Sequence, residues 1–147
     1  MGIGNTTTSA AMAAAMLRCD VATVTGRGAG LNDSGFEKKI SVIESAIEKY
    51  DLYNKDTFEI LMTVGGLDIA GLVGVCIGGA LYHIPVVLDG VISMVSALAA
   101  GRLLSGVTDF IISSHEGREP AVALLCEALS VRPVIRAVSY THLRAHE

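Results

Sequence analysis

Short apolar segments alternate with helical ones along this chain, and this alternation constrains its fold more than any other feature. Residues 20–25, 85–88 and 109–112 are short runs rich in branched side chains, with the length of buried strands. Helical patterns cover residues 6–18, 36–50, 57–64, 69–82, 91–104 and 119–129, and residues 132–135 have the composition of a further strand. The chain is therefore predicted to be α/β, with a doubly wound parallel sheet and helices on both faces in a Rossmann-like three-layer arrangement.

Composition excludes several classes of protein. The 147 residues suffice for one domain with a core, and the net charge of −4 argues against a nucleic-acid-binding surface. The three cysteines are widely spaced, so we expect reduced thiols in a cytoplasmic protein rather than disulfides or zinc. Residues 69–88 carry no charged side chain, but His83 and Pro85 interrupt them, so we expect no membrane span.

A glycine loop leads into a helix at the N-terminus. Gly2 and Gly4 flank Ile3, and Asn5 and Thr6 precede an alanine-rich run. Asn5 or one of the threonines after it is in position to cap this helix. The free N–H groups and dipole of a helix N-terminus favour an anion, most often a phosphate. The spacing matches neither G-x-G-x-x-G nor a Walker loop, so a capped helix without a ligand fits equally well.

Polar residues also follow the predicted strands, where parallel sheets bind their ligands. Asp89 ends one strand and is expected either to point into the crevice or to cap the next helix. Asp68, after two glycines, has the same two interpretations. His115 follows two serines at another strand end, but the G-x-S-x-G elbow of hydrolases is missing.

Four segments, in this order, resemble the nicotinate-nucleotide:dimethylbenzimidazole phosphoribosyltransferase family: GIGNTT (2–7), TGRGAGL (25–31), VGGLDIAG (64–71) and PVVLDGVIS (85–93). The resemblance implies a parallel-sheet domain over residues 1–137, an incomplete small helical domain, and a homodimer. It implies transfer of phosphoribose from nicotinate mononucleotide to 5,6-dimethylbenzimidazole, which gives α-ribazole 5′-phosphate and nicotinate in cobalamin biosynthesis. No metal or redox cofactor is implied.

The matching segments also imply roles for individual residues. Asp68 and Asp89 are the implied catalytic carboxylates, because a carboxylate stabilises the positive charge that the ribosyl centre gains as nicotinate leaves. The implied substrate- and phosphate-binding residues are Gly2, Ile3, Gly4, Asn5, Thr6, Gly28, Ala29, Lys39, Gly90, Val91, Ser113, Ser114 and His115.

The sequence departs from the family at its C-terminal end. The family's general base is a glutamate in a Leu-Gly-Glu-Gly-type loop, whereas residues 138–147 match nothing in the family and are expected to be a disordered tail. We therefore expect weak or no turnover from this chain. Two other interpretations stay open: a non-catalytic nucleotide-phosphate binding module, which needs only the first loop, and a small membrane protein built on residues 69–104.

Overall fold

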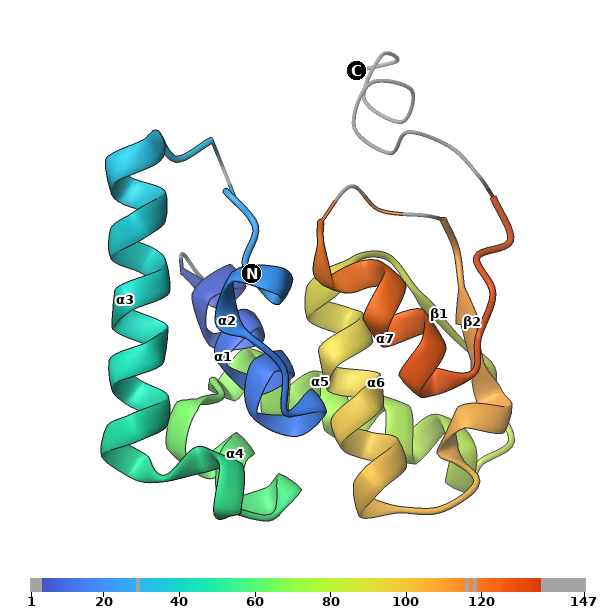
Figure 1. The fold of residues 1–147 in the computed structure, drawn as a ribbon. Helices are drawn as coiled ribbons and strands as arrows, with labels where there is room; N and C mark the ends of the chain where they lie inside the picture. Colours follow the sequence, from blue (N-terminus) through green and yellow to red (C-terminus); the bar gives the residue numbers. More distant parts are fainter. Residues whose placement is uncertain (1–3, 29, 116, 118, 136–147) are drawn as a thin grey trace.

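A computed structural model of the chain describes residues 4–28, 30–115, 117 and 119–135 (Figure 1). The elements, in chain order, are α1 (Asn5–Leu17), α2 (Val21–Val24), α3 (Asp33–Tyr50), η1 (Leu52–Asn54), α4 (Thr57–Val64), α5 (Leu67–Leu81), β1 (Val86–Leu88), α6 (Val91–Leu103), η2 (Val107–Phe110), β2 (Ile111–Ser113) and α7 (Ala121–Leu129). Most predicted helices therefore exist, with ends within a few residues of those expected.

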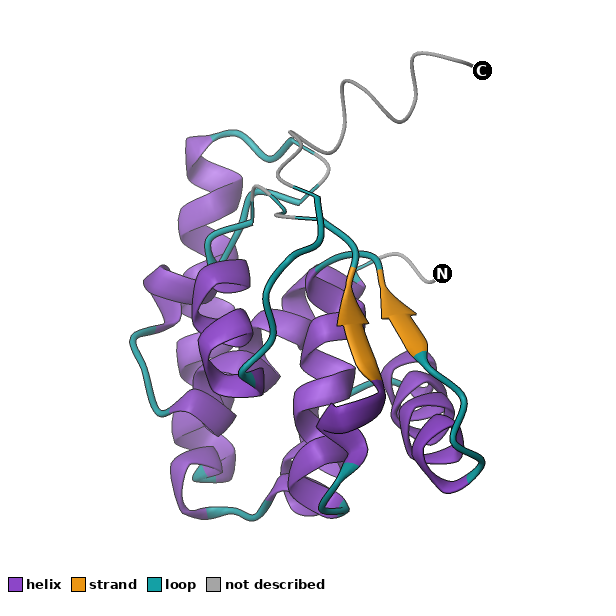
Figure 2. Cartoon of the chain, turned by 90° about the vertical axis from the view of Figure 1, so that its right-hand side faces the viewer, coloured by secondary structure: helices purple, strands orange, loops and turns teal. Residues whose placement is uncertain are grey.

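The two strands form a parallel pair joined through α6. Val86 is opposite Ile111 and Leu88 is opposite Ser113, and Figure 2 shows both arrows pointing the same way in front of a helix. A parallel pair needs such a crossover helix, so the predicted parallel α/β class is confirmed. The chain comes back beside β2 at residues 134–135, where a further strand was expected, but only a single bridge joins Ile135 to His115.

The two faces of this sheet differ in the part of the chain that the structure describes. Leu88, Ile111 and Ser113 are buried against the helices. Val87 and Ile112, which are paired across the strands, are 63% and 41% exposed. The described helices therefore cover one face, and the other presents branched apolar side chains.

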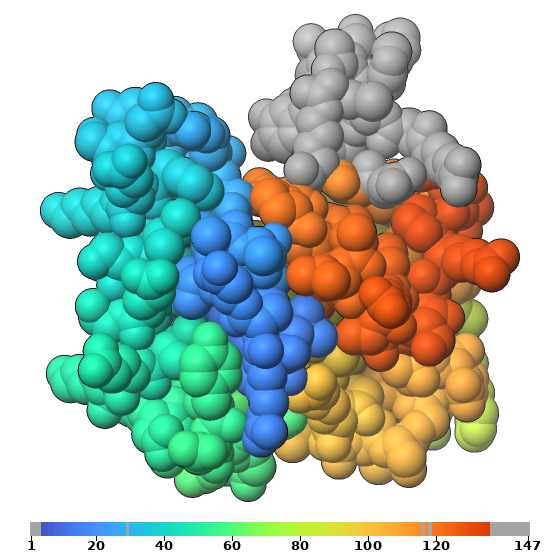
Figure 3. All heavy atoms as spheres, in the orientation of Figure 1, coloured from blue at the N-terminus to red at the C-terminus, as the bar shows by residue number. Residues whose placement is uncertain are grey.

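Helix α1 lies at the centre of the core. It packs against α3, α4 and α6, and Figure 3 shows the blue N-terminal segment between α3 on the left and the orange-red α7 on the right. Its residues from Ser9 to Met16 are all buried, and five of those eight are alanines. Small side chains let the neighbouring helices approach closely, which explains how one helix can be enclosed on several sides.

The prediction of a strand over residues 20–25 is wrong, because this segment forms α2. The Asp20 carboxylate accepts a hydrogen bond from the backbone N–H of Ala22, at 2.9 Å, and caps the helix. The Thr25 hydroxyl donates to the carbonyl of Val21, at 2.7 Å. Such local side-chain bonds to the backbone compete with strand pairing.

The strand predicted over residues 109–112 is displaced. Residues up to Phe110 form the turn η2, and β2 begins only at Ile111. The turn follows Gly106, whose φ of 84° starts a tight bend that an extended segment does not accommodate. Among the described helices, none has the combination of length and hydropathy needed to cross a membrane.

Candidate functional site

Helix α1 begins without a side-chain cap. Gly4 is its N-cap residue, with a φ of 90°, and Asn5 is already helical, so the expectation of a capping Asn5 or threonine is wrong. The N–H of Thr7 donates to the carbonyl of Gly4, and the Thr8 hydroxyl donates to the carbonyl of Asn5. Because Gly4 has no side chain, no side-chain cap competes with water or an anion for the first N–H groups of this helix.

Lys39 reaches this helix start from α3. Its ammonium donates to the carbonyl of Gly26, at 2.8 Å, and to the hydroxyl of Thr6, at 3.2 Å. The residue is only 7% exposed. Burial lowers the pKa of Lys39 from its usual value, and the nearby Glu119 carboxylate opposes that shift. An ammonium has three donors, and the described residues accept hydrogen bonds from two of them.

Lys39 lies in the wall of an open cavity of about 300 Å³ at the N-terminus of α1. The cavity is lined by Gly4, Thr6, Thr7, Arg27, Gly28, Gly30, Leu31 and Lys39. Gly28 has a φ of 55°, and a Cβ at this position would lie 3.1 Å from the Thr6 hydroxyl. Glycine is therefore suited to this turn in both backbone conformation and space. The structure thus brings together four of the predicted binding residues.

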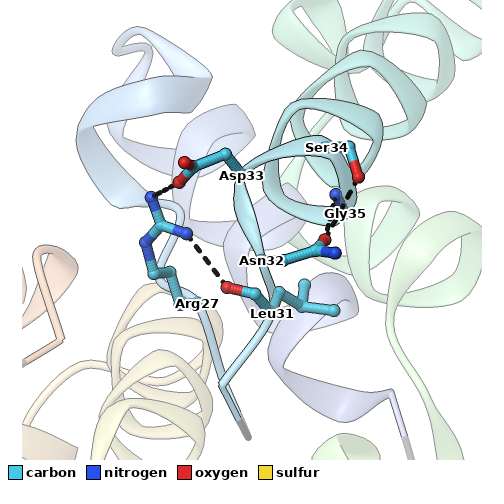
Figure 4. Close-up of polar contacts among 6 residues, drawn as sticks. All are labelled: Arg27, Leu31, Asn32, Asp33, Ser34 and Gly35. Carbon is cyan, nitrogen blue, oxygen red and sulfur yellow. Dashed lines mark hydrogen bonds and ion pairs between the residues drawn. The ribbon is translucent and has the colours of Figure 1, made fainter.

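Arg27, which also lines the cavity, is held by its neighbours (Figure 4). It forms an ion pair with Asp33, at 2.6 Å, and donates to the carbonyl of Leu31, at 2.9 Å. Its guanidinium lies 4.9 Å from the ring centroid of Phe36. Asn32 caps α3 beside this group, since its side chain accepts from the N–H of Gly35. Arg27 thus fixes the end of the glycine turn to the start of α3.

Asp68 joins the same region from the start of α5. Its Oδ2 accepts a hydrogen bond from the Asn5 amide, at 3.1 Å, and its Oδ1 accepts from the N–H of Ile69. Gly66, and not Asp68, is the N-cap of α5, so the simple capping interpretation of Asp68 is wrong. The Asn5 hydrogen bond, followed by that of Ile69, lowers the pKa of Asp68, which keeps this carboxylate ionised.

Replacing Asn5 with alanine is expected to raise the pKa of Asp68 toward its usual value, because the first of these hydrogen bonds is lost. A group whose pKa is depressed by folding stabilises the fold above its unfolded-state pKa and loses that effect as the pH falls through its folded-state pKa. Carboxyl ¹³C NMR titration measures the change. Asn54→Ala, which removes an amide bonded to Asp51, is the control and should leave Asp68 unaltered. An unchanged Asp68 titration in Asn5→Ala would refute this coupling.

The second group of predicted residues lies at the ends of the strands. Asp89 follows β1, and its carboxylate is 93% exposed and lies 4.0 Å from Nδ1 of the buried His115. The same Nδ1 shares a hydrogen bond of 2.8 Å with the Ser114 hydroxyl. The N–H of Ser114 donates to the carbonyl of Leu88, which ties this loop to the end of β1. Gly90, and not Asp89, is the N-cap of α6, so the capping interpretation of Asp89 is wrong.

Ser93 and Glu119 contact residues of the candidate site, but the sequence did not single them out. The N–H groups of Asp89 and Gly90 both donate to the Ser93 hydroxyl, at 3.1 and 3.2 Å. Ser93 in turn donates to the carbonyl of Gly90, at 2.8 Å. The spacing of a hydroxyl three residues after the N-cap is the signal that would have found it. Glu119 has no such sequence signal, because only the fold places it beside Gly26.

The remaining predicted binding residues either pack in the protein interior or lie outside the described residues. Val91 packs against the core at the start of α6, and Ser113 is buried in β2. Gly2, Ile3 and Ala29 are outside the described part of the chain. The pocket residues around Lys39 and the group around His115 are two separate clusters, since no hydrogen bond or ion pair joins them among the described residues.

A helix N-terminus without a side-chain cap, beside a buried lysine, is a place where α/β proteins commonly bind anionic groups. A phosphoribosyltransferase family model matches residues 1–138. The chain belongs to this phosphoribosyltransferase family.

Relatives with known names agree with this assignment. The chain is 43% identical over 135 residues to the nicotinate-nucleotide–dimethylbenzimidazole phosphoribosyltransferase of Clostridium perfringens strain 13, and the match covers 92% of this chain but 37% of that one. It is 42% identical to the enzyme of the same name from Acetivibrio thermocellus, with 38% of that protein covered. The chain thus spans less than two fifths of the length of these relatives.

The structural comparison gives the same result. The crystal structure of CobT from Thermus thermophilus superimposes with a TM-score of 0.87 at 33% sequence identity. The match covers 92% of this chain and 40% of the CobT chain. The described elements therefore have the arrangement of part of that larger α/β protein.

Proposed function

We propose that this chain forms the phosphate- and ribose-binding part of an enzyme that transfers phosphoribose from nicotinate mononucleotide to 5,6-dimethylbenzimidazole. The observation that carries the proposal is the buried Lys39 beside the uncapped start of α1. A nucleotide phosphate placed there accepts from the helix N–H groups and from the remaining donor of Lys39. The names of the relatives supply the two substrates.

The proposed reaction exchanges one glycosidic bond for another. The bond between the ribose C1′ and the nicotinate nitrogen breaks, and nicotinate leaves with the bonding electrons. The unprotonated nitrogen of dimethylbenzimidazole forms the new bond to C1′, and the other ring nitrogen loses its proton, which leaves the ring neutral. The ribosyl centre gains positive charge between these events, so ionised carboxylates near it stabilise the transition state. Asp68 and Asp89 are proposed for this role. We assign no residue of this chain as the base that takes the proton.

The lowered pKa of Asp68 supports its part in this scheme, because a carboxylate must be ionised to stabilise a cation. Asn5 links Asp68 to the helix start, so the phosphate end and the ribose end of the nucleotide would be held by neighbouring residues. On the family resemblance we further propose that the full-length protein is a cytoplasmic homodimer built on a Rossmann-like sheet.

Calorimetric titration with nicotinate mononucleotide tests the proposed function. The chain is expected to bind this nucleotide, and Gly4→Val is expected to weaken binding by roughly tenfold or more, because a branched residue is strained at a φ of 90°. Space is not the reason, since a Cβ at Gly4 would meet no atom within 4 Å. Gly71→Val is the matched control, because this exposed helical glycine also has open space around it.

Circular dichroism would establish that each variant is folded before titration. A folded wild-type chain that does not bind nicotinate mononucleotide would contradict the proposed function. Equal binding by Gly4→Val would remove the start of α1 from the site.

A further inference from the structure

The Glu119 side chain reaches from the segment before α7 to the glycine turn after α2. Its carboxylate occupies the space that the Cβ of any other residue at position 26 would need. Gly26 is buried, and its carbonyl accepts the 2.8 Å hydrogen bond from Lys39. The carbonyl of Gly26 therefore binds the Lys39 ammonium, while the Glu119 carboxylate lies against the Cα of the same residue.

Few other charges surround Lys39 in the described part of the chain. The two helices that pack on α3 beside it, α1 and α2, contain no charged residue. Arg27 lines the same cavity but is paired with Asp33. Glu119 is the neighbouring anion that acts on Lys39, and its charge opposes the effect of burial on the Lys39 pKa.

We propose that Glu119 is a positioning residue of the phosphate pocket, whose carboxylate supplies the countercharge of Lys39 and packs on Gly26 to hold the turn that Lys39 binds. The inference rests on the proposed function, because it gives that pocket a further residue. A lysine binds phosphate best as a cation, and burial alone works against that form. Glu119 thus acts through Lys39 and not on the substrate, and it connects α7 to the N-terminal half of the pocket.

NMR titration of Lys39 in the unliganded 147-residue chain is the first test. With ¹³C-labelled lysine, the Lys39 signal is the one lost in Lys39→Met. In Glu119→Gln the Lys39 titration is expected to move to lower pH, because the opposing charge is removed while the shape of the side chain is kept. Glu119→Asp, which keeps the charge, should restore most of the wild-type titration. Glu127→Gln, an equal charge change on the exposed side of α7, should have no effect.

Gly26→Ala provides an independent route to the same result. The new Cβ overlaps the end of a flexible side chain, so it is expected to displace the Glu119 carboxylate rather than the backbone. Its Lys39 titration should therefore shift in the same direction as in Glu119→Gln. The double variant should show no further shift, because the two changes remove one interaction.

The pH profile of nucleotide binding separates this inference from the proposed function. Binding of nicotinate mononucleotide weakens at alkaline pH as Lys39 loses its proton, and in Glu119→Gln this decline is expected at lower pH. If the wild-type chain does not bind the nucleotide but the Lys39 titration still shifts, the role of Glu119 stands and the proposed function fails. If the wild-type chain binds and neither profile shifts in Glu119→Gln, the inference is overturned and the function stands.

Discussion

Replacing Lys39 with methionine is expected to weaken the binding of nicotinate mononucleotide by roughly a hundredfold. The variant would lose the proposed charge-assisted bond to the phosphate. It also removes the ammonium that donates to the Gly26 carbonyl and to the Thr6 hydroxyl. Methionine has about the same length as lysine and suits a buried position, so the helix packing should be kept. Calorimetric titration measures the affinity.

Lys49→Met is the control for this loss. Lys49 is on the same helix, but it is exposed and lies over the ring of Tyr50, away from the cavity. The Lys49→Met variant should bind the nucleotide with the affinity of the wild-type chain. Wild-type affinity in Lys39→Met would place the phosphate elsewhere, and equal loss in both lysine variants would mean that only net charge matters.

Replacing Met12 with alanine is expected to lower the free energy of unfolding by about 2–5 kcal/mol. Met12 is fully buried in α1, so truncating its side chain leaves a cavity in the core. A loss of this size is a large part of the stability of a small domain. Urea denaturation, monitored by circular dichroism, measures the change.

Met62→Ala is the matched control, because Met62 is 72% exposed on α4. Its effect is expected to stay within about 0.5 kcal/mol. Similar losses in both variants would contradict the central position of α1 in the core.

The sequence was sufficient to predict the class of fold, because the helices have strong local signals. The segment over residues 57–64 is bounded by Asp56 and Gly65, and α4 has those bounds with a capping box formed by Asp56 and Glu59. The strands β1 and β2 were found from their branched residues, although β2 begins later than expected.

The error at residues 20–25 shows the limit of such patterns. Two valines and two threonines favour a strand, but a strand also needs a neighbour to pair with. In the structure, Asp20 and Thr25 bond to the local backbone and stabilise a turn of helix. Whether such a segment becomes a strand or a helical turn depends on whether the fold places another strand beside it. The residue preferences of the segment do not contain this information.

The same distinction applies to the site. The glycine loop and its neighbours indicated where an anion would bind, and Lys39 was implied by the family resemblance. The contact between Glu119 and Gly26 joins residues that are far apart in the chain, so no local spacing predicts it. Ser93 was within reach of a local rule, because its hydroxyl bonds to the backbone of Asp89 and Gly90.

The burial of α1 has a consequence for the coupling of ligand binding to the rest of the molecule. The helix is enclosed by its neighbours along most of its length, and only its first turn opens on the cavity. Its amide protons can then exchange with solvent only when the surrounding helices separate, so their exchange rates report global unfolding. A nucleotide held at the first turn would bind the folded state and not the unfolded state, so it would raise the free energy of unfolding. Hydrogen exchange would therefore slow throughout the core, and not only where the nucleotide touches the protein.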